Sequence, residues 1–78
     1  MNMEEKIRGF LKERFGNYSD DIGTTDSLES VVDSMGLFDL VAFIEKEFGT
    51  LIPNEEFSPQ RFVTIRDIID VIEEFRSN

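Results

Sequence analysis

Residues 33–49 read DSMGLFDLVAFIEKEFG, and this stretch decides which class of fold the chain can adopt. A helix can begin at Asp33 or Ser34, and Gly49 supplies a natural end after Phe48. Between these ends, five apolar side chains recur at helical spacing: Leu37, Leu40, Val41, Ile44 and Phe48. The pattern predicts a central helix against which the rest of the chain must pack.

Upstream of this stretch, the sequence predicts one helix and one long loop. Residues 3–15 carry an apolar stripe at helical spacing, followed by Gly16 as a stop signal. The stripe consists of Met3, Ile7, Phe10, Leu11 and Phe15. Residues 16–32 are rich in Gly, Asp, Ser and Thr, with Ile22 and Leu28 as isolated apolar anchors, so we expect a loop there.

Downstream, the sequence predicts a short helix and a longer final one. Pro53 forces a break, and residues 55–62 are expected to hold the short helix, interrupted or started near Pro59. Thr64 and Asp67 are spaced as in a capping box, so they predict the start of the last helix. Three longer helices and one short helix predict an all-α fold, a small four-helix bundle in one domain spanning residues 1–78.

The composition excludes several classes of function. The 78 residues include no cysteine and no histidine, which excludes disulfides, thiolate or imidazole metal sites and Ser-His-Asp or Cys-His catalysis. We therefore expect neither an enzyme nor a metal site. A calcium loop aligned on Gly23 would place Tyr18 and Ile22 at ligand positions, which argues against an EF-hand. The absence of cysteine fits a cytoplasmic protein, and the longest apolar run, residues 40–44, is too short for a membrane span.

The net charge of −9 is unevenly distributed along the chain. Segment 3–15 holds four bases and three acids, so the other residues hold 14 acids and only four bases. Such acidity disfavours nucleic acid and favours basic protein partners. It is equally compatible with a charge that only keeps a small domain soluble and monomeric.

A second apolar stripe lies on the central helix, at Met35, Phe38 and Ala42. One interpretation is that the helix is buried nearly all round. The other is that the stripe is an exposed docking face, framed by three acids: Asp39, Glu45 and Glu47.

Ser34 is the candidate functional residue at the start of this helix. A serine in that position most often serves only as a helix cap. The same position also suits a phosphodiester, because helix N-termini carry partial positive charge and unpaired N–H groups. A long preceding loop would leave the hydroxyl accessible to a modifying enzyme.

Asp33-Ser34-Met35 resembles the Asp-Ser-Leu signature of the acyl carrier protein family, with methionine in place of leucine. The resemblance covers essentially the whole chain. Its other segments are Leu40-Val41, Ile44, Glu45-Lys46-Glu47-Phe48-Gly49, Leu51-Ile52-Pro53, Glu55-Glu56 and Thr64-Ile65-Arg66-Asp67-Ile68-Ile69.

The resemblance implies a four-helix carrier that presents cargo to enzymes and supplies no catalytic residue itself. A phosphopantetheinyl transferase, using magnesium and coenzyme A, would attach 4'-phosphopantetheine to Ser34, beside Asp33 and Met35. An acyl- or aminoacyl-activating ligase would then load the thiol, and a downstream transferase would unload it. Docking to these partners is expected at Met35, Phe38, Asp39, Ala42, Glu45, Glu47, Glu55 and Glu56. The alternative is an unmodified, acidic helical interaction module that docks through Met35 and Phe38.

The sequence departs from fatty-acid carriers in ways that bear on cargo. Val31 and Val32 precede the aspartate, and Gly36 occupies the place where those carriers have an acid. The chain looks more like stand-alone aminoacyl or D-alanyl carriers and peptidyl carrier domains. We also expect four phenylalanines to meet where carriers hold long acyl chains, leaving room only for short cargo: Phe38, Phe43, Phe57 and Phe62.

Overall fold

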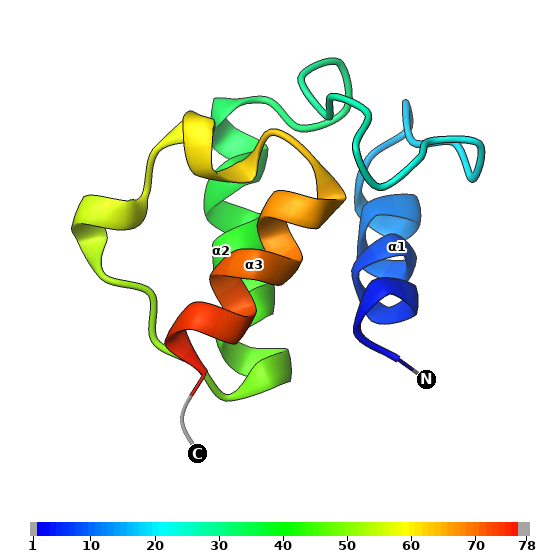
Figure 1. Ribbon diagram of the computed structural model, residues 1–78. Helices are drawn as coiled ribbons and strands as arrows, with labels where there is room; N and C mark the ends of the chain where they lie inside the picture. Colours follow the sequence, from blue (N-terminus) through cyan, green and yellow to red (C-terminus); the bar gives the residue numbers. More distant parts are fainter. Residues whose placement is uncertain (1, 77–78) are drawn as a thin grey trace.

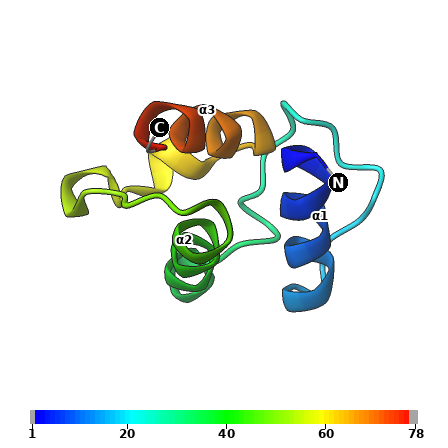
Figure 2. The same ribbon diagram turned by 90° about the horizontal axis from the view of Figure 1, so that it is seen from below.

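The computed structural model describes residues 2–76 and contains three α-helices joined by a long loop and by two 3-10 turns (Figure 1). The helices are α1 (Met3–Arg14), α2 (Ser34–Phe48) and α3 (Ile65–Phe75), and the 3-10 turns are η1 (Asn54–Glu56) and η2 (Pro59–Phe62). Figures 1 and 2 together show α2 and α3 as neighbours, with α1 standing beside the pair and η1 on the opposite side. The predicted mostly helical fold is confirmed.

Each α-helix begins at a side-chain cap. Asn2 and Glu5 form a capping box for α1, and Thr64 and Asp67 form the one predicted for α3. Asp33 caps α2, and Gly49 ends it in the left-handed conformation, with φ of 62°. Glycine adopts this conformation without the steric cost that a Cβ would bring.

The predicted short helix at 55–62 is instead split into η1 and η2. Pro59 lacks an N–H group, and its ring would clash with the carbonyl of Glu55 in a continuous helix. The residue before a proline favours an extended conformation, and Ser58 has φ of −124° and ψ of 143°. Two short turns therefore stand where a fourth helix was expected, and the described residues contain three α-helices.

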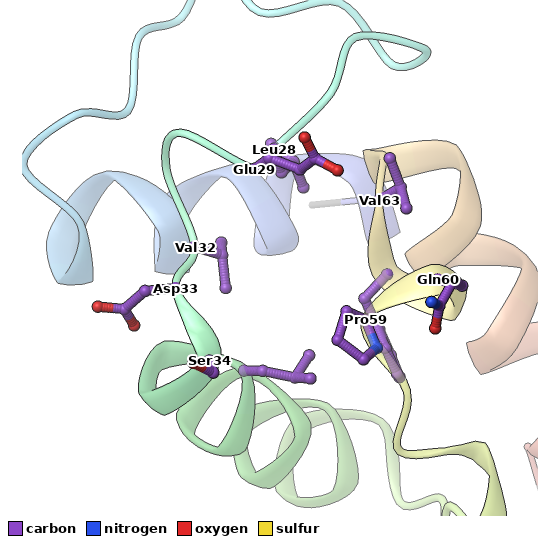
Figure 3. Close-up of a pocket in the computed structure, with 10 residues that line it drawn as sticks. Leu28, Glu29, Val32, Asp33, Ser34, Pro59, Gln60 and Val63 are labelled. Atoms are coloured by element: carbon purple, nitrogen blue, oxygen red, sulfur yellow. The ribbon is translucent and has the colours of Figure 1, made fainter.

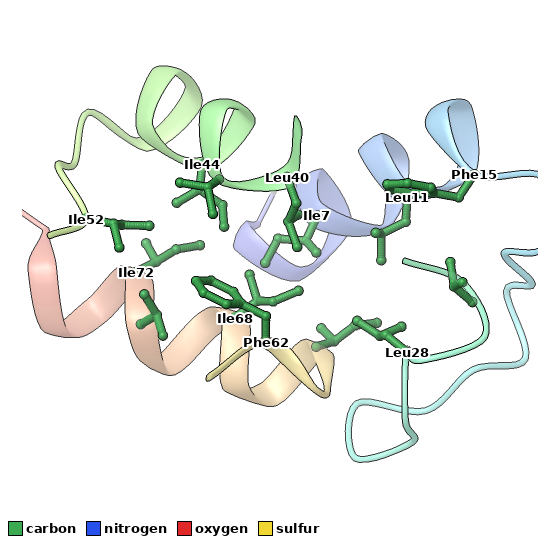
Figure 4. Close-up of a cluster of buried hydrophobic side chains, with 14 residues drawn as sticks. Ile7, Leu11, Phe15, Leu28, Leu40, Ile44, Ile52, Phe62, Ile68 and Ile72 are labelled. Carbon is green, nitrogen blue, oxygen red and sulfur yellow. The ribbon is translucent and has the colours of Figure 1, made fainter. Parts of the chain in front are cut away.

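The hydrophobic core draws on all three helices, the long loop and the segment around the 3-10 turns (Figure 4). Its members are Ile7, Leu11, Phe15, Leu28, Val31, Leu40, Val41, Ile44, Ile52, Phe62, Ile65, Ile68, Val71 and Ile72. Leu28 is 1% exposed, so the loop before α2 contributes a fully buried side chain to the core.

Backbone hydrogen bonds also connect the long loop to the segment between η2 and α3. The Leu28 amide donates to the Val63 carbonyl at 2.7 Å, and the Arg66 amide donates to the Thr24 carbonyl at 2.9 Å. These bonds join the loop to the junction between η2 and α3. The start of α2 consequently lies next to η2, although about 25 residues of chain separate them (Figure 3).

The phenylalanine rings do not gather as expected. Phe43 stacks on Phe10 of α1, with ring centroids 4.4 Å apart, and Phe48 meets Phe43 edge-on at 6.1 Å. Phe38 is 61% exposed, and Phe62 is buried in the core. The expectation of a four-ring cluster is therefore wrong, because the α1–α2 contact uses much of the aromatic content.

Candidate functional site

Ser34 is the first residue of α2 and is exposed to solvent. The cap of this helix is Asp33, whose Oδ1 accepts a hydrogen bond from the Gly36 amide at 2.6 Å. The interpretation of Ser34 itself as the cap is therefore wrong, since the aspartate side chain already occupies that role. Within residues 2–76, the Ser34 hydroxyl forms no hydrogen bond with another group.

A tight turn holds the approach to Ser34. The amides of Val31 and Val32 both donate to the Leu28 carbonyl, at 2.9 and 2.8 Å. Leu28 and Val31 are buried, so the backbone just before Asp33 is held against the core. The exposed Ser34 hydroxyl therefore follows a backbone segment whose position is fixed by the core.

Gly36 has a steric reason for being glycine. A Cβ at this position would lie 2.5 Å from Cε1 and 2.9 Å from Cζ of the Phe15 ring. The absence of an acid at this place therefore follows from how α1 packs on α2, and it carries less information about cargo than the sequence indicated. It also leaves the first turn of α2 without an acidic residue, so only the Asp33 cap offsets the partial positive charge there.

Beside Ser34 the surface opens into a cavity of about 360 Å³, here called the Ser34 hollow (Figure 3). Its walls come from the end of the long loop, the first turn of α2, and η2 with the residue that follows it. The lining residues are Leu28, Glu29, Val32, Asp33, Ser34, Leu37, Pro59, Gln60, Phe62 and Val63. The cavity therefore begins at the side chain that the sequence singled out.

The Ser34 hollow is mostly apolar, with Glu29, Asp33 and Gln60 as its larger polar side chains. No basic side chain lines it, so it offers no opposite charge to an anionic group. Its η2 wall is held by Arg61, which pairs with Glu56 at 3.4 Å and with Glu74 at 3.0 Å. The hydrogen bond to Glu74 raises the pKa of Arg61 above its ordinary value, so the guanidinium stays charged.

The Met35 stripe, consisting of Met35, Phe38 and Ala42, faces solvent. Met35 is 74% exposed and Phe38 is 61% exposed, which are high values for large apolar side chains. Of the two interpretations of this stripe, burial all round is wrong. The exposed face begins one residue after Ser34, on the same helix.

The acids expected to frame this stripe are already engaged within the protein. Asp39 forms an ion pair with Arg14 of α1. Glu45 accepts a hydrogen bond from the Ile52 amide at 2.9 Å. Glu47 pairs with Lys6 of α1 at 3.3 Å. At about 3.6 residues per turn, Glu47 lies roughly 140° around the helix axis from Ala42, and so away from the stripe. The expected frame of three acids is therefore wrong for Glu47.

The two acids predicted downstream lie in η1. Glu55 is exposed, whereas Glu56 is partly buried and paired with Arg61. Figures 1 and 2 both place η1 at the edge of the molecule away from α1, so these two acids belong to a different part of the surface.

Sequence reasoning missed several residues that the fold brings to the site. Gln60 and Val63 meet Ser34 across the hollow, and no local pattern could have linked segments this far apart. Lys46 is an exposed base on the same face of α2 as the stripe, and helical spacing from Ala42 could have identified it.

Within residues 2–76, no group of three or more carboxylates is placed to hold a metal ion. No helix in that part of the chain combines the length and apolar character needed to cross a bilayer. A comparison with the models of known protein families finds no match.

Proposed function

We propose that this protein is a carrier that is phosphopantetheinylated on Ser34 and shuttles a thioester-bound acyl or aminoacyl group between enzymes. The observation that carries the proposal is the state of the Ser34 hydroxyl. It is exposed, free of hydrogen bonds within the described residues, and fixed at the start of a helix beside an open hollow. A hydroxyl used only for capping would be bonded to the backbone.

The residues present fit a phosphodiester on Ser34. The helix N-terminus favours negative charge; the Asp33 cap already offsets part of its positive charge, and the first turn of α2 itself contains no further acid. In the attachment step, the Ser34 oxygen forms a bond to the phosphorus that carries pantetheine in coenzyme A. The pyrophosphate bond breaks, adenosine bisphosphate leaves, and the hydroxyl proton passes to a base of the transferase. The attached arm supplies the thiol that this cysteine-free chain lacks.

The Met35 stripe is the proposed contact for the phosphopantetheinyl transferase. An enzyme that reaches the Ser34 hydroxyl must approach the first turns of α2, where Met35 and Phe38 project into solvent. The activating ligase and the downstream transferase would use the same approach, and we place all these partners in the cytoplasm. Because Asp39 and Glu45 already have internal partners, apolar contact is the main source of affinity in this proposal.

The attachment reaction tests the proposal directly. The unmodified protein is incubated with coenzyme A, magnesium and several broad-specificity phosphopantetheinyl transferases, and its intact mass is measured. We expect the mass of one phosphopantetheine to be added. No gain with any of the transferases would refute the carrier function.

An unmodified interaction module is the second candidate, because the Met35 stripe is exposed whether or not Ser34 carries a group. The two candidates differ in their response to Ser34→Ala. The module would bind its partner unchanged, whereas the carrier would lose all cargo transfer. Phe38→Ala weakens partner binding under both functions, so it serves as the positive control.

A further inference from the structure

Lys46 places a positive charge on the exposed face of α2, in a chain whose net charge is −9. We infer that the transferase meets this face with an apolar pocket for Met35 and Phe38 and with an acidic side chain opposite Lys46. The inference rests on the proposed function and deepens it by naming the chemistry of the partner surface. It departs from the basic partner that the acidity of the chain indicated.

Lys46 continues the Met35 stripe by one helical turn. Lys46 follows Ala42 by four residues, so it lies one turn further along α2 and about 40° around the helix axis. Met35 and Phe38 also lie within about 40° of Ala42. All four residues are exposed. The stripe therefore begins beside Ser34 and ends, in the last turn of α2, in a positive charge.

No described residue neutralises this charge. Within residues 2–76, the ion pairs involve other basic side chains, and Lys46 takes part in none of them. Ion pairs along a helix join residues three or four positions apart. The residues at those distances from Lys46 are all uncharged: Ala42, Phe43, Gly49 and Thr50. A partner can therefore pair with Lys46 without displacing an internal acid.

The acids of α2 nearest to Lys46 have partners inside the protein. Asp39 and Glu47 form ion pairs with bases of α1, so neither pair adds net charge to the stripe. The partly buried Glu45 accepts a hydrogen bond from the Ile52 amide. Lys46 is thus the charged group of this face that can select the charge of a partner.

The acids at the start of α2 lie too far from Lys46 to set the charge of its partner. Asp33 precedes Lys46 by 13 residues, which corresponds to about 20 Å along the helix axis. At physiological ionic strength the Debye length is about 8 Å, so charges on the surface at that separation are largely screened from each other. A group in direct contact with Lys46 therefore responds mainly to Lys46.

One enzyme can reach both Ser34 and Lys46. The two residues are separated by about 18 Å along the helix axis. A standard interface buries about 800 Å² on each partner, which is a patch roughly 28 Å across. An enzyme that acts on the Ser34 hydroxyl can therefore cover the whole stripe, while Lys46 stays remote from the reacting atoms.

The kinetics of attachment test the inference. Initial rates are measured at saturating coenzyme A and increasing concentrations of unmodified protein, with the transferase that is most active on the wild type. We expect Lys46→Gln to raise KM by about two- to fivefold, as the loss of one exposed ion pair would. Lys46→Glu should raise KM further, because like charges then face each other. The value of kcat should stay close to that of the wild type, because Lys46 is remote from Ser34.

Lys12→Gln and Lys12→Glu are the matched controls. They change the net charge by the same amounts at another exposed lysine, which lies on α1 and pairs with Asp20 of the long loop. We expect their KM values to stay near that of the wild type. Far-ultraviolet circular dichroism of each variant checks that the helices are retained.

The outcomes separate the two proposals. A KM for Lys46→Glu at or below the wild-type value would overturn the acidic partner surface and leave the carrier function standing. Equal increases in the Lys46 and Lys12 variants would also overturn it, since net charge would then be the cause. Self-association of the unmodified protein that Phe38→Ala abolishes would assign the stripe to a second copy instead. Failure of attachment to the wild type with every transferase would overturn the carrier function, and the inference with it.

Discussion

Gly36→Ala is expected to destabilise the protein, although replacing glycine by alanine within a helix usually does the opposite. The new Cβ would lie 2.5 Å from a ring carbon of Phe15, whereas nonbonded carbons prefer about 3.5–4.0 Å. The ring cannot retreat freely, because it is 8% exposed, packs edge-on against Phe10 and lies beneath the Arg14 guanidinium.

The magnitude follows from two opposing terms. Overpacking a well-filled site costs about 1–3 kcal/mol. Removing a glycine from a helix returns about 0.5–1 kcal/mol. With an overpacking cost of about 2 kcal/mol, in the middle of that range, the net effect should be a loss of about 1–1.5 kcal/mol in the free energy of unfolding. For a domain of this size, each kcal/mol lowers the melting temperature by about 4–8 °C.

Gly9→Ala is the matched control, because Gly9 lies within α1 and a Cβ there would meet nothing within 4 Å. Urea unfolding followed by far-ultraviolet circular dichroism measures both variants. We expect Gly9→Ala to gain about 0.5–1 kcal/mol while Gly36→Ala loses stability. Adding Phe15→Leu to Gly36→Ala should reduce the loss, because the smaller side chain frees the space. A Gly36→Ala protein as stable as wild type would refute the packing argument.

Three further predictions concern contacts that fix the ends of α2 and α3. Asp33→Ala should lower stability by about 1 kcal/mol in thermal unfolding, with Asp33→Asn close to wild type, because both Asp and Asn can cap; equal losses in the two would contradict the cap. Glu45→Ala should cost about 1–3 kcal/mol in urea unfolding by leaving the Ile52 amide unpaired, and Glu45→Gln should recover most of it. Thr50→Val should cost about 1–3 kcal/mol, because the buried hydroxyl donates to the Phe75 carbonyl at 2.6 Å. Thr50→Ser keeps this bond and should be the more stable of the two.

Local patterns in the sequence were enough to predict the three α-helices. The apolar spacing of α2 and the Thr64–Asp67 capping box depend on residues within a few positions of one another. The division of 55–62 into two turns was only half anticipated, since Pro59 indicated an interruption but not which geometry would replace the helix.

The sequence could predict only those features of the candidate site that depend on residues close together in the chain. The exposed position of Ser34 follows from its place at the start of α2. The partners of the acids do not, because Arg14 and Lys6 reach Asp39 and Glu47 from another helix. Gly36 shows the same limit, since its steric partner Phe15 lies 21 positions earlier in the chain.

The assignment of Ser34 as the attachment point is tested most directly by treating three proteins identically with coenzyme A and one active transferase. These are the wild type, Ser34→Ala and Ser30→Ala, a control at another exposed serine in the loop just before α2. We predict that one phosphopantetheine is added to the wild type and to Ser30→Ala at similar rates, and that none is added to Ser34→Ala. Addition to Ser34→Ala, or its absence from the wild type, would contradict the account.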